Sequence, residues 1–480
     1  MTPTPPTLQR DQLVDLAVTS LAFGGKGVAR VDDFVVFVSG AVPGDVVRAR
    51  VLKTKKRYAE ARAEELLTPS PDRRPPRCSL FGACGGCAWQ DLDYQAQLRY
   101  KAGQVRESLE HLGGLRDFDL HPIVGMDSPW RYRNRADFSI GTATDGAVVG
   151  FRPRGSWDSV LPLSECHLLE PGIEAVRATV QDWLRENDVA GWDPRNGSGF
   201  ARHLLARSSD GGKELLVSLV TASPELSGPD SLVARLRATH PQLVGVVHAV
   251  NPGKAELSAG LPSTTLWGRP FLLEKLAGLT LKVSLDAFFQ TNTQMAGLLY
   301  GLIAQATGLA AGAPEAGARA GRTDAPVVWD LYSGVGSIGL SLASRAKAVL
   351  GIEAIAPAVA DARENALLNA IANAHFVEGD VAVVLREVAD GVRAVPQGLE
   401  APDLIVLDPP RAGLSNKAVS RVGETGAAAI VYVSCNPSTL APNVAQFLAY
   451  GYRLEEVTPV DMFPHTPHVE CVALLSRAAA

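Results

Sequence analysis

The sequence predicts a multidomain protein with an N-terminal β-barrel, a central α+β region and a C-terminal doubly wound α/β domain. Three observations lead to this prediction. From Leu13 to Thr68, short strand-like apolar runs alternate with glycine-bearing turns such as GGKG and PGD. The stretch PSPDRRPPR that follows has the composition of a linker. From Asp286 onward, helical and strand-like patterns alternate, which favours a parallel sheet covered by helices on both faces. We therefore expect domains at 1–70, 71–285 and 286–480.

The composition indicates several globular cores and excludes two other classes of protein. The 480 residues exceed the ~100 to 200 residues of one ordinary domain. Hydrophobic residues make up 46% of the chain and charged residues 20%, so wholesale disorder is excluded. No run approaches the ~18 consecutive apolar residues that a membrane span needs, and MTPTPPTLQR lacks the features of a signal peptide. We expect a cytoplasmic protein that does not bind a membrane.

The net charge of -5 argues against a protein that coats nucleic acid along its whole surface, but the basic residues are unevenly distributed. The stretch VRARVLKTKKRYAEAR includes Lys53, Lys55, Lys56 and Arg57. On charge alone, it is either a phosphate-binding surface or an edge strand whose lysines block aggregation. The runs GGKGVAR, VVFVSGAVPGDVVRARV and KKRY resemble the TRAM domain, an RNA-binding barrel with an OB-like fold. This resemblance favours RNA contact by these four residues.

A glycine-rich turn follows the strand VVWDLYS and opens a helix, with the pattern G-x-G-x-x-G beginning at Gly334 and Gly336. Such a turn brings backbone amides close to a ligand, although glycines also occur where a turn is merely tight. Glu353 and Asp380 end the next two strands, where a carboxylate can bind ribose hydroxyls. NAD and S-adenosylmethionine (SAM) both fit this arrangement. Asp330 completes the pattern D-x-x-x-G-x-G that is typical of class I methyltransferases, so we favour SAM.

Three further motifs place reactive side chains at the ends of predicted strands. LIVLDPPRAG ends one strand with Asp408, and its two prolines make the turn rigid. IVYVSCNPSTLA ends the next strand with Cys435, and DMFPHTPHVECVALLSR begins the last strand with Glu470. Taken singly, an Asp-Pro turn or a buried cysteine is usually structural. Together, at the sheet edge where ligands bind, they indicate an active site. For the neighbouring His465 and His468 we expect hydrogen-bonding or loop-shaping roles rather than a metal pair.

A thiol and a carboxylate at this edge fit the methylation of uracil at C5. C5 is a poor nucleophile toward a sulfonium methyl group, but a thiolate that adds to C6 makes C5 enolate-like. C5 then takes the methyl group from SAM, a base removes the C5 proton, and elimination restores the ring and frees the cysteine. The scheme needs one nucleophile and one base, for which Cys435 and Glu470 are the candidates.

The motifs DxxxGxG, DPPRAG, SCNP and DMFPHTxHVE, in this order, resemble those of the RNA 5-methyluridine methyltransferases over nearly the whole chain. The resemblance implies a Rossmann-like class I methyltransferase domain in which Cys435 is the nucleophile and Glu470 the C5 base. Asp408 would hold the target or the cofactor near the reaction centre. FFQTNTQ resembles the family's F-x-Q-x-N segment. The SAM-binding residues implied are Gln290, Tyr332, Ser337, Glu353 and Asp380, together with Gly334, Gly336 and Asp408.

Four cysteines outside the C-terminal domain form a second candidate site. Cys78, Cys84 and Cys87 follow the pattern C-x5-C-x2-C, and Cys166 supplies a fourth thiol. Four thiolates suit zinc or an iron–sulfur cluster, and the spacing does not choose between them. The 5-methyluridine enzymes that carry a TRAM domain and act on 23S ribosomal RNA resemble this arrangement and hold a 4Fe-4S cluster. We therefore expect a 4Fe-4S cluster rather than zinc in the central domain, with a structural or an RNA-contacting role.

The sequence thus predicts a SAM-dependent enzyme that methylates C5 of a uridine in 23S rRNA to give 5-methyluridine. A tRNA uridine is the alternative substrate. A non-catalytic RNA-binding or ribosome-assembly factor with the same fold is a further alternative, which the intact Cys435, Glu470 and Asp408 disfavour. A radical-SAM or redox enzyme is disfavoured because the pattern C-x3-C-x2-C is absent. RNA is the expected partner, and the sequence indicates no protein partner.

Overall fold

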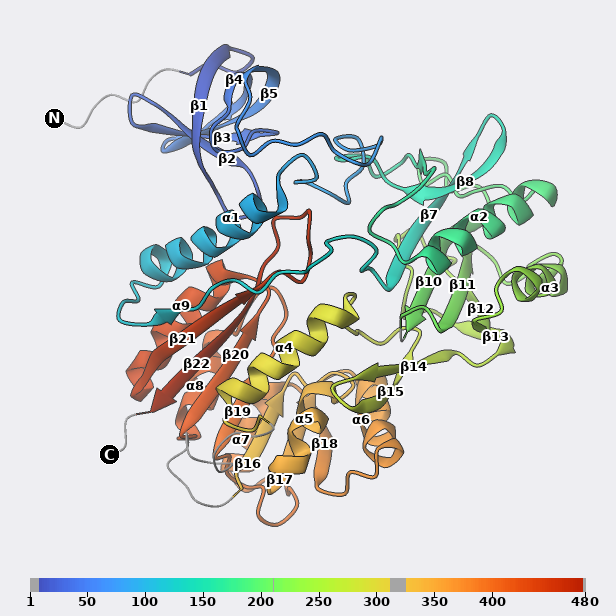
Figure 1. The fold of residues 1–480 in the computed structure, drawn as a ribbon. Helices are drawn as coiled ribbons and strands as arrows, with labels where there is room; N and C mark the ends of the chain where they lie inside the picture. Colours follow the sequence, from blue (N-terminus) through green and yellow to red (C-terminus); the bar gives the residue numbers. More distant parts are fainter. Residues whose placement is uncertain (1–7, 210, 311–324, 478–480) are drawn as a thin grey trace.

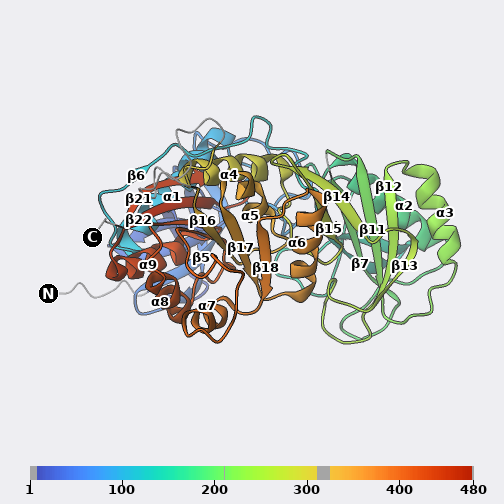
Figure 2. The ribbon, with the colours of Figure 1, turned by 90° about the horizontal axis from the view of Figure 1, so that it is seen from below.

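The computed structural model describes residues 8–209, 211–310 and 325–477. Figure 1 shows three regions along the chain: a small barrel at the top, a sheet with helices on the right, and a larger α/β region below. Seen from below, the hairpin of β14 (Phe271–Leu276) and β15 (Leu279–Ser284) lies between the central and C-terminal sheets (Figure 2). None of the helices in the described ranges is both long and apolar enough for a transmembrane span.

The N-terminal barrel forms because its strands alternate buried and less buried residues, which gives the curved sheet one apolar face. In β3, for example, Phe34, Val36 and Val38 are buried and the residues between them are partly exposed. The strand order is β1-β2-β3-β5-β4, and β4 also pairs with β1 to close the barrel. The structure therefore confirms the predicted barrel. Its strands are β1 (Leu13–Leu21), β2 (Gly27–Val31), β3 (Phe34–Ser39), β4 (Val46–Thr54) and β5 (Tyr58–Thr68).

The central region is a largely antiparallel sheet with helices on one face, in the order β13-β12-β11-β10-β7-β8-β9. Helix α2 buries Ile173, Val176 and Val180, which recur at helical spacing, against Phe138 and Leu204 of the sheet. Helix α3 covers the same face. The elements are β7 (Arg135–Ala143), β8 (Gly146–Phe151), β9 (Leu161–Pro162), α2 (Pro171–Glu186), β10 (Ala201–Ser209), β11 (Glu214–Thr221), α3 (Pro229–Thr239), β12 (Leu243–Val250) and β13 (Ser263–Gly268).

The C-terminal region is the doubly wound sheet that the sequence predicted, in the order β18-β17-β16-β19-β20-β22-β21-β6. Strands β16 to β20 are parallel, whereas β22 runs antiparallel to β20. Strands β16, β19 and β20 are buried throughout, as expected for a sheet covered on both faces. Helices α4, α5 and α6 cover one face, and α7, α8 and α9 cover the other. The elements are α4 (Thr293–Ala306), β16 (Val327–Leu331), α5 (Ser337–Leu342), β17 (Ala348–Glu353), α6 (Ala356–Leu368), β18 (Ala374–Glu378), α7 (Val381–Ala389), β19 (Leu404–Leu407), α8 (Asn416–Glu424), β20 (Ala429–Ser434), α9 (Pro437–Phe447), β21 (Tyr452–Val460) and β22 (Glu470–Arg477).

A segment that precedes the central sheet in the sequence packs on the C-terminal sheet instead. Strand β6 (Asp119–Leu120) pairs in parallel with β21. Helix α1 (Tyr94–Glu107) continues into a π-helical turn, and Val105 and Leu109 of this segment are fully buried in the core beneath α7, α8 and α9. The range 71–285 therefore includes a part that belongs, by its packing, to the C-terminal sheet.

The hairpin β14–β15 contacts both large sheets. Leu281 is buried in the C-terminal core, whereas Leu272 packs against the central sheet. Asn365 of α6 and Asn369, which follows the helix, accept hydrogen bonds from backbone amides of β15 at 2.6 and 2.9 Å. The hairpin leads into the segment that carries Gln290 and then into α4, so it places that segment against the C-terminal region.

Candidate active site and cysteine pocket

The candidate catalytic residues meet at one edge of the C-terminal sheet. Strands β16 and β19 end at the paired residues Leu331 and Leu407, and the neighbouring β20 continues two residues beyond its pair with Leu407, so all three strands end at the same edge of the sheet. Asp408 follows β19, Cys435 follows β20, and the antiparallel strand β22 begins at this edge with Glu470. Tyr332 and Glu353 stand at the ends of β16 and β17 on the same edge. Parallel α/β sheets bind their ligands at this edge.

The glycine turn after β16 has a backbone conformation that most side chains disfavour. Gly334 and Gly336 have φ angles of 54° and 80°. A Cβ atom at Gly336 would lie 2.7 Å from Phe376, whereas one at Gly334 would meet nothing within 4 Å. Tyr332 also has a positive φ, 64°, and such backbone strain costs roughly 1–3 kcal/mol and clusters at functional sites. The turn is therefore packed against Phe376 at Gly336, whereas the space beside Gly334 is free for a ligand to approach the backbone.

Two carboxylates hold this turn by its backbone amides. Glu353 Oε2 accepts from Gly334 N at 3.0 Å, and Asp330 Oδ2 accepts from Gly339 N at 2.8 Å. Asp330 is fully buried, and burial raises its pKa to about 7. Its Oδ1 and the buried Ser333 Oγ have no hydrogen-bond partner in the described part of the chain. Unpartnered buried polar atoms beneath an open turn fit a site that a polar ligand completes.

The other predicted cofactor residues surround the turn in different ways. Ser337 begins α5, and its hydroxyl is hydrogen-bonded to the Tyr300 hydroxyl at 2.6 Å. Gln290 is buried, and its backbone carbonyl accepts from Asn134 Nδ2 at 3.1 Å. Asp380 is exposed and caps α7 by accepting from a backbone amide of that helix at 3.1 Å. Ser337 and Asp380 thus already have structural partners.

Burial favours the protonated form of three acidic groups at the sheet edge. Burial and then the nearby Glu470 carboxylate raise the pKa of the Cys435 thiol to about 11. Burial and the charge of Asp408 raise the pKa of Glu470 to about 8. Burial and the charge of Asp330 raise the pKa of Asp408 to about 7. The Arg411 guanidinium acts in the opposite direction and lowers the pKa of both Cys435 and Glu470. A thiol and a carboxyl with perturbed, interdependent pKa values are typical of a catalytic site.

The turns that carry Cys435 and Arg411 are hydrogen-bonded to each other. Asn436 caps α9 through Oδ1, which accepts from Ser438 N at 3.1 Å. Its Nδ2 donates to the Arg411 carbonyl at 3.1 Å, and Thr439 Oγ1 donates to the same carbonyl at 3.4 Å. The DPPR and SCNP turns therefore form one unit, which holds the thiol near the arginine.

The four predicted cluster ligands line one cavity in the central region. Cys78, Cys84, Cys87 and Cys166 border a space of about 280 Å³. Burial raises the pKa of Cys87 to about 12, and the other three thiols are close enough to add to this rise. Gln90 Nε2 donates to Cys87 Sγ at 3.2 Å. Within the described residues, no group of three or more His, Cys, Asp or Glu side chains is arranged so that it could hold a metal ion. The cluster stays a prediction, for which four thiols around one cavity are a suitable donor set.

Comparison with known proteins identifies the family. Residues 9–63 match the model of the TRAM domain, and residues 318–478 match that of the tRNA (uracil-5-)-methyltransferases. An RNA methyltransferase of Halalkalibacterium halodurans is 34% identical over 98% of this chain and 98% of its own. One of Lactiplantibacillus plantarum is 36% identical over 98% of this chain and 94% of its own. The chain belongs to the RNA uracil-5-methyltransferase family.

A solved structure supports the cofactor of this methyltransferase. The tRNA (uracil-54, C5)-methyltransferase of Pyrococcus abyssi, in complex with S-adenosyl-L-homocysteine, is 28% identical and superimposes with a TM-score of 0.74. The match covers 96% of the present chain and 100% of the Pyrococcus chain. The protein is a SAM-dependent RNA (uracil-5-)-methyltransferase, which confirms the family, the enzyme class and the cofactor that the sequence predicted.

The basic stretch of the TRAM barrel divides into two parts. Arg48 forms an ion pair with Asp15 at 2.9 Å, and Arg50 forms one with Glu64 at 2.6 Å. Acidic residues of neighbouring strands therefore neutralise the basic residues of the β4–β5 hairpin that lie away from its tip. At the tip, four basic side chains are exposed and form no ion pair within the described ranges: Lys53, Lys55, Lys56 and Arg57. Glu60, which pairs across from Lys53, offsets part of this positive charge, and the remainder at the hairpin tip can bind a phosphate backbone.

Sequence reasoning did not select Arg411 as a candidate site residue. The motif DPPRAG contains it, three residues after Asp408, but the motif drew attention to its carboxylate and prolines. Only the fold shows that this guanidinium affects both Cys435 and Glu470. The individual roles of Cys435, Glu470 and Asp408 stay predictions, which their shared position at the sheet edge supports.

Proposed function

We propose that this enzyme forms 5-methyluridine in 23S rRNA through a covalent adduct between Cys435 and uracil C6. The observation that supports this chemistry is the meeting of a thiol, a buried carboxyl and the cofactor turn at one sheet edge. The preference for rRNA rests on the four-cysteine cavity combined with a TRAM barrel, the combination that resembles the 23S rRNA enzymes.

Cys435 opens the reaction as a thiolate. Its Sγ forms a bond to C6, and the π electrons of the C5–C6 bond move toward C5 and the adjacent carbonyl. Arg411 favours this step because its positive charge lowers the pKa of the thiol. Bound SAM would supply the methyl group for C5, with its sulfonium sulfur as the leaving group. Asp408 lies at the strand end between the cofactor turn and Cys435, where it holds the uracil or the cofactor in position.

Glu470 completes the reaction as the C5 base. Its carboxylate removes the C5 proton, the electrons of that bond restore the C5–C6 double bond, and the sulfur–C6 bond breaks. A carboxylate with a pKa of about 8 holds the abstracted proton more firmly than an ordinary glutamate does. Cys435 returns to its starting state and the methylated RNA is released.

The chain's own residues provide the binding sites for cofactor, cluster and RNA. The open turn at Gly334, the Glu353 carboxylate and the unpartnered atoms of Asp330 and Ser333 fit the polar parts of SAM. We assign the remaining contacts to SAM as follows: Gln290, Tyr332, Gly336, Ser337, Asp380 and Asp408. We assign a 4Fe-4S cluster, in preference to zinc, to Cys78, Cys84, Cys87 and Cys166, and RNA phosphates to Lys53, Lys55, Lys56 and Arg57.

A tRNA uridine is the second candidate substrate. The Pyrococcus abyssi structure, whose match covers 96% of this chain, is that of a tRNA (uracil-54, C5)-methyltransferase, and the family model that matches residues 318–478 is named for tRNA. The methyl-transfer chemistry at Cys435 and Glu470 is the same for either RNA.

Transfer of labelled methyl groups separates these functions. Anaerobically purified enzyme is incubated with labelled SAM and unmodified 23S rRNA or tRNA transcripts, and the product nucleosides are digested and mapped. We expect 5-methyluridine in 23S rRNA. Label in tRNA alone would keep the mechanism and overturn the substrate. If SAM binds but neither RNA is labelled, a non-catalytic RNA-binding or ribosome-assembly factor becomes the better description.

A further inference from the structure

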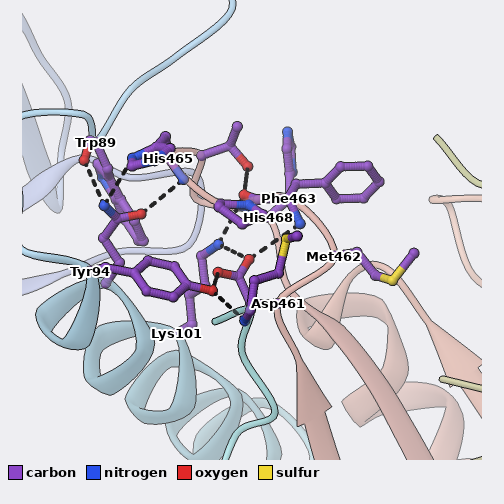
Figure 3. Close-up of polar contacts among 12 residues, drawn as sticks. Trp89, Tyr94, Lys101, Asp461, Met462, Phe463, His465 and His468 are labelled. Atoms are coloured by element: carbon purple, nitrogen blue, oxygen red, sulfur yellow. Dashed lines mark hydrogen bonds and ion pairs between the residues drawn. The ribbon is translucent and has the colours of Figure 1, made fainter. Parts of the chain in front are cut away.

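A fully buried ion pair connects α1 to the loop that leads to Glu470. Lys101 Nζ lies 2.5 Å from Asp461 Oδ1, and neither side chain has any exposed surface. Figure 3 shows Tyr94 and Lys101 of the same helix face pointing toward Asp461. The Tyr94 hydroxyl donates to Asp461 Oδ2 at 2.9 Å, and Lys101 Nζ also donates to the Phe463 carbonyl at 3.1 Å. Two residues of α1 therefore hold both ends of this short turn.

The backbone of the loop is held from several sides. His465 has a φ of 65°, a strained conformation that persists only where the surroundings enforce it. Gln97 of α1 enforces it from one side, because its Oε1 accepts from His465 N at 2.8 Å. Four successive backbone carbonyls of the loop accept hydrogen bonds from four different segments. The Met462 carbonyl accepts from Asn292 Nδ2 at 3.0 Å, and the Phe463 carbonyl accepts from Lys101. The Pro464 carbonyl accepts from the Tyr132 hydroxyl at 3.0 Å, and the His465 carbonyl accepts from the amides of Ala88 and Trp89 at 3.0 and 3.1 Å.

Stability alone does not account for a charged pair in this place. Removing two charges from water is costly, and well-packed apolar residues often stabilise a core as much or more. Burial indeed lowers the pKa of Lys101, against the opposing effect of Asp461. In some proteins a buried pair of this kind is retained because it specifies one conformation of the backbone around it. Here that backbone is the segment 461–469, which ends directly before Glu470.

We propose that Lys101 and Asp461 are positioning residues that aim the Glu470 carboxyl at C5 of the target uracil. The inference rests on the proposed role of Glu470 as the C5 base. Cys435 follows β20 and lies outside this loop, on a turn held by Asn436 and Arg411. Weakening the ion pair therefore slows proton removal from C5 more than thiol addition or methyl transfer. The methylated covalent adduct, which waits for that proton removal, accumulates.

The test is the double variant Lys101→Met/Asp461→Asn in the full chain. It removes both charges together, so no unpaired charge stays buried, and the asparagine oxygen still accepts from Tyr94. We expect kcat to fall about 10- to 100-fold, the cost of a small misplacement of a reacting group, with both KM values nearly unchanged. We also expect the RNA adduct to build up on denaturing gels, as a general loss of folded enzyme would not cause.

Two further variants keep the test decisive. Tyr94→Phe removes one hydroxyl from the same carboxylate and is expected to lower kcat and increase the adduct in the same direction, to a smaller extent. The control Arg269→Met/Glu214→Gln removes an ion pair of the central sheet and is expected to leave kcat and the adduct unchanged.

A kcat close to that of the wild type in both loop variants, or a parallel loss of adduct and turnover in them, would overturn the inference. Glu470→Gln distinguishes this failure from that of the proposed function. If Glu470→Gln traps the adduct while the loop variants turn over normally, the positioning role alone is wrong. If Glu470→Gln releases methylated RNA as fast as the wild type, the role of Glu470 is wrong and the inference falls with it.

Discussion

Cys435 and Glu470 are both protonated in the free enzyme near neutral pH, although the reaction needs both in ionised form. Burial is the main cause, since it raises the thiol pKa to about 11 and the carboxyl pKa to about 8. Arg411 offsets part of this effect at both groups. The positive sulfonium of bound SAM would act in the same direction as Arg411.

Replacement of the nucleophile separates catalysis from folding. Cys435→Ala is expected to lower turnover by on the order of 1,000-fold or more and to abolish the covalent RNA adduct, because no other group forms the bond to C6. Methyl transfer and adduct formation are measured with the same labelled RNA. Cys471→Ala is the matched control. Cys471 is a buried cysteine of the adjacent strand β22 and pairs across from Ser434, so its replacement should leave methyl transfer and adduct formation intact. An active Cys435→Ala enzyme would exclude covalent addition.

The pH dependence of adduct breakdown tests the base. Glu470 removes a proton only as a carboxylate, and its raised pKa of about 8 means that the ionised fraction increases about tenfold per pH unit below 8 and levels off above it. The rate of adduct breakdown in single turnovers should therefore rise from pH 6 and reach a plateau above about 8.

Two variants assign that profile to Glu470. Glu470→Gln should trap the adduct at every pH. Arg411→Gln should move the rise to higher pH, since the guanidinium favours the carboxylate form, and Arg411→Lys should restore the profile. A breakdown rate that does not change with pH would remove Glu470 from the role of base.

At the scale of elements, strands that end in reactive motifs could be predicted because each signal is local. The apolar run before Asp408 or Cys435 indicates a strand, and the alternation with helices indicates that these strands are parallel. Their ends then share an edge whatever the loop lengths. Strand β6 and helix α1 could not be predicted in this way, because their partners β21 and α9 lie more than 300 positions later. Lys101 accordingly looks like any surface lysine of an amphipathic helix, although it is fully buried against Asp461.

For the β4–β5 hairpin, the distribution of charge predicts how RNA binding depends on salt. Lys55→Ala/Lys56→Ala should weaken RNA binding and reduce the salt slope of log K by roughly 1 to 2, at ~0.7 to 0.9 per phosphate contact. Binding is measured over a series of salt concentrations. The matched control Arg48→Ala/Arg50→Ala removes the same charge from positions that Asp15 and Glu64 already neutralise, so its salt slope should stay close to that of the wild type. Equal effects of the two pairs would mean that the hairpin tip does not bind phosphate.

At the scale of the whole molecule, backbone hydrogen bonds connect the segment that carries Cys87 to the loop that precedes Glu470. Ala88 and Trp89 directly follow Cys87, and their amides bind the carbonyl of His465. Trp130 stacks on His465 with ring centroids 4.0 Å apart and forms a T-shaped pair with His167, the neighbour of Cys166. The four cysteines could be grouped from the sequence by elimination, but their proximity to the catalytic loop required the fold. A metal centre bound by these thiols would stabilise the segments next to Cys87 and Cys166, against which the segment 461–469 packs.

Removal of a cysteine ligand should therefore lower stability as well as metal content. Anaerobically purified wild-type enzyme is expected to contain iron and to absorb visible light, whereas Cys84→Ser should lose both. Because a ligand that binds only the folded state stabilises it, the unfolding temperature of Cys84→Ser should fall well below that of the wild type. The control Cys471→Ala should keep its iron. SAM binding, measured by calorimetry, should survive in Cys84→Ser, because Glu353 and the glycine turn belong to the C-terminal sheet and do not line the cysteine cavity. Zinc in place of iron, with the same dependence on Cys84, would keep the site and its structural role but change the metal centre.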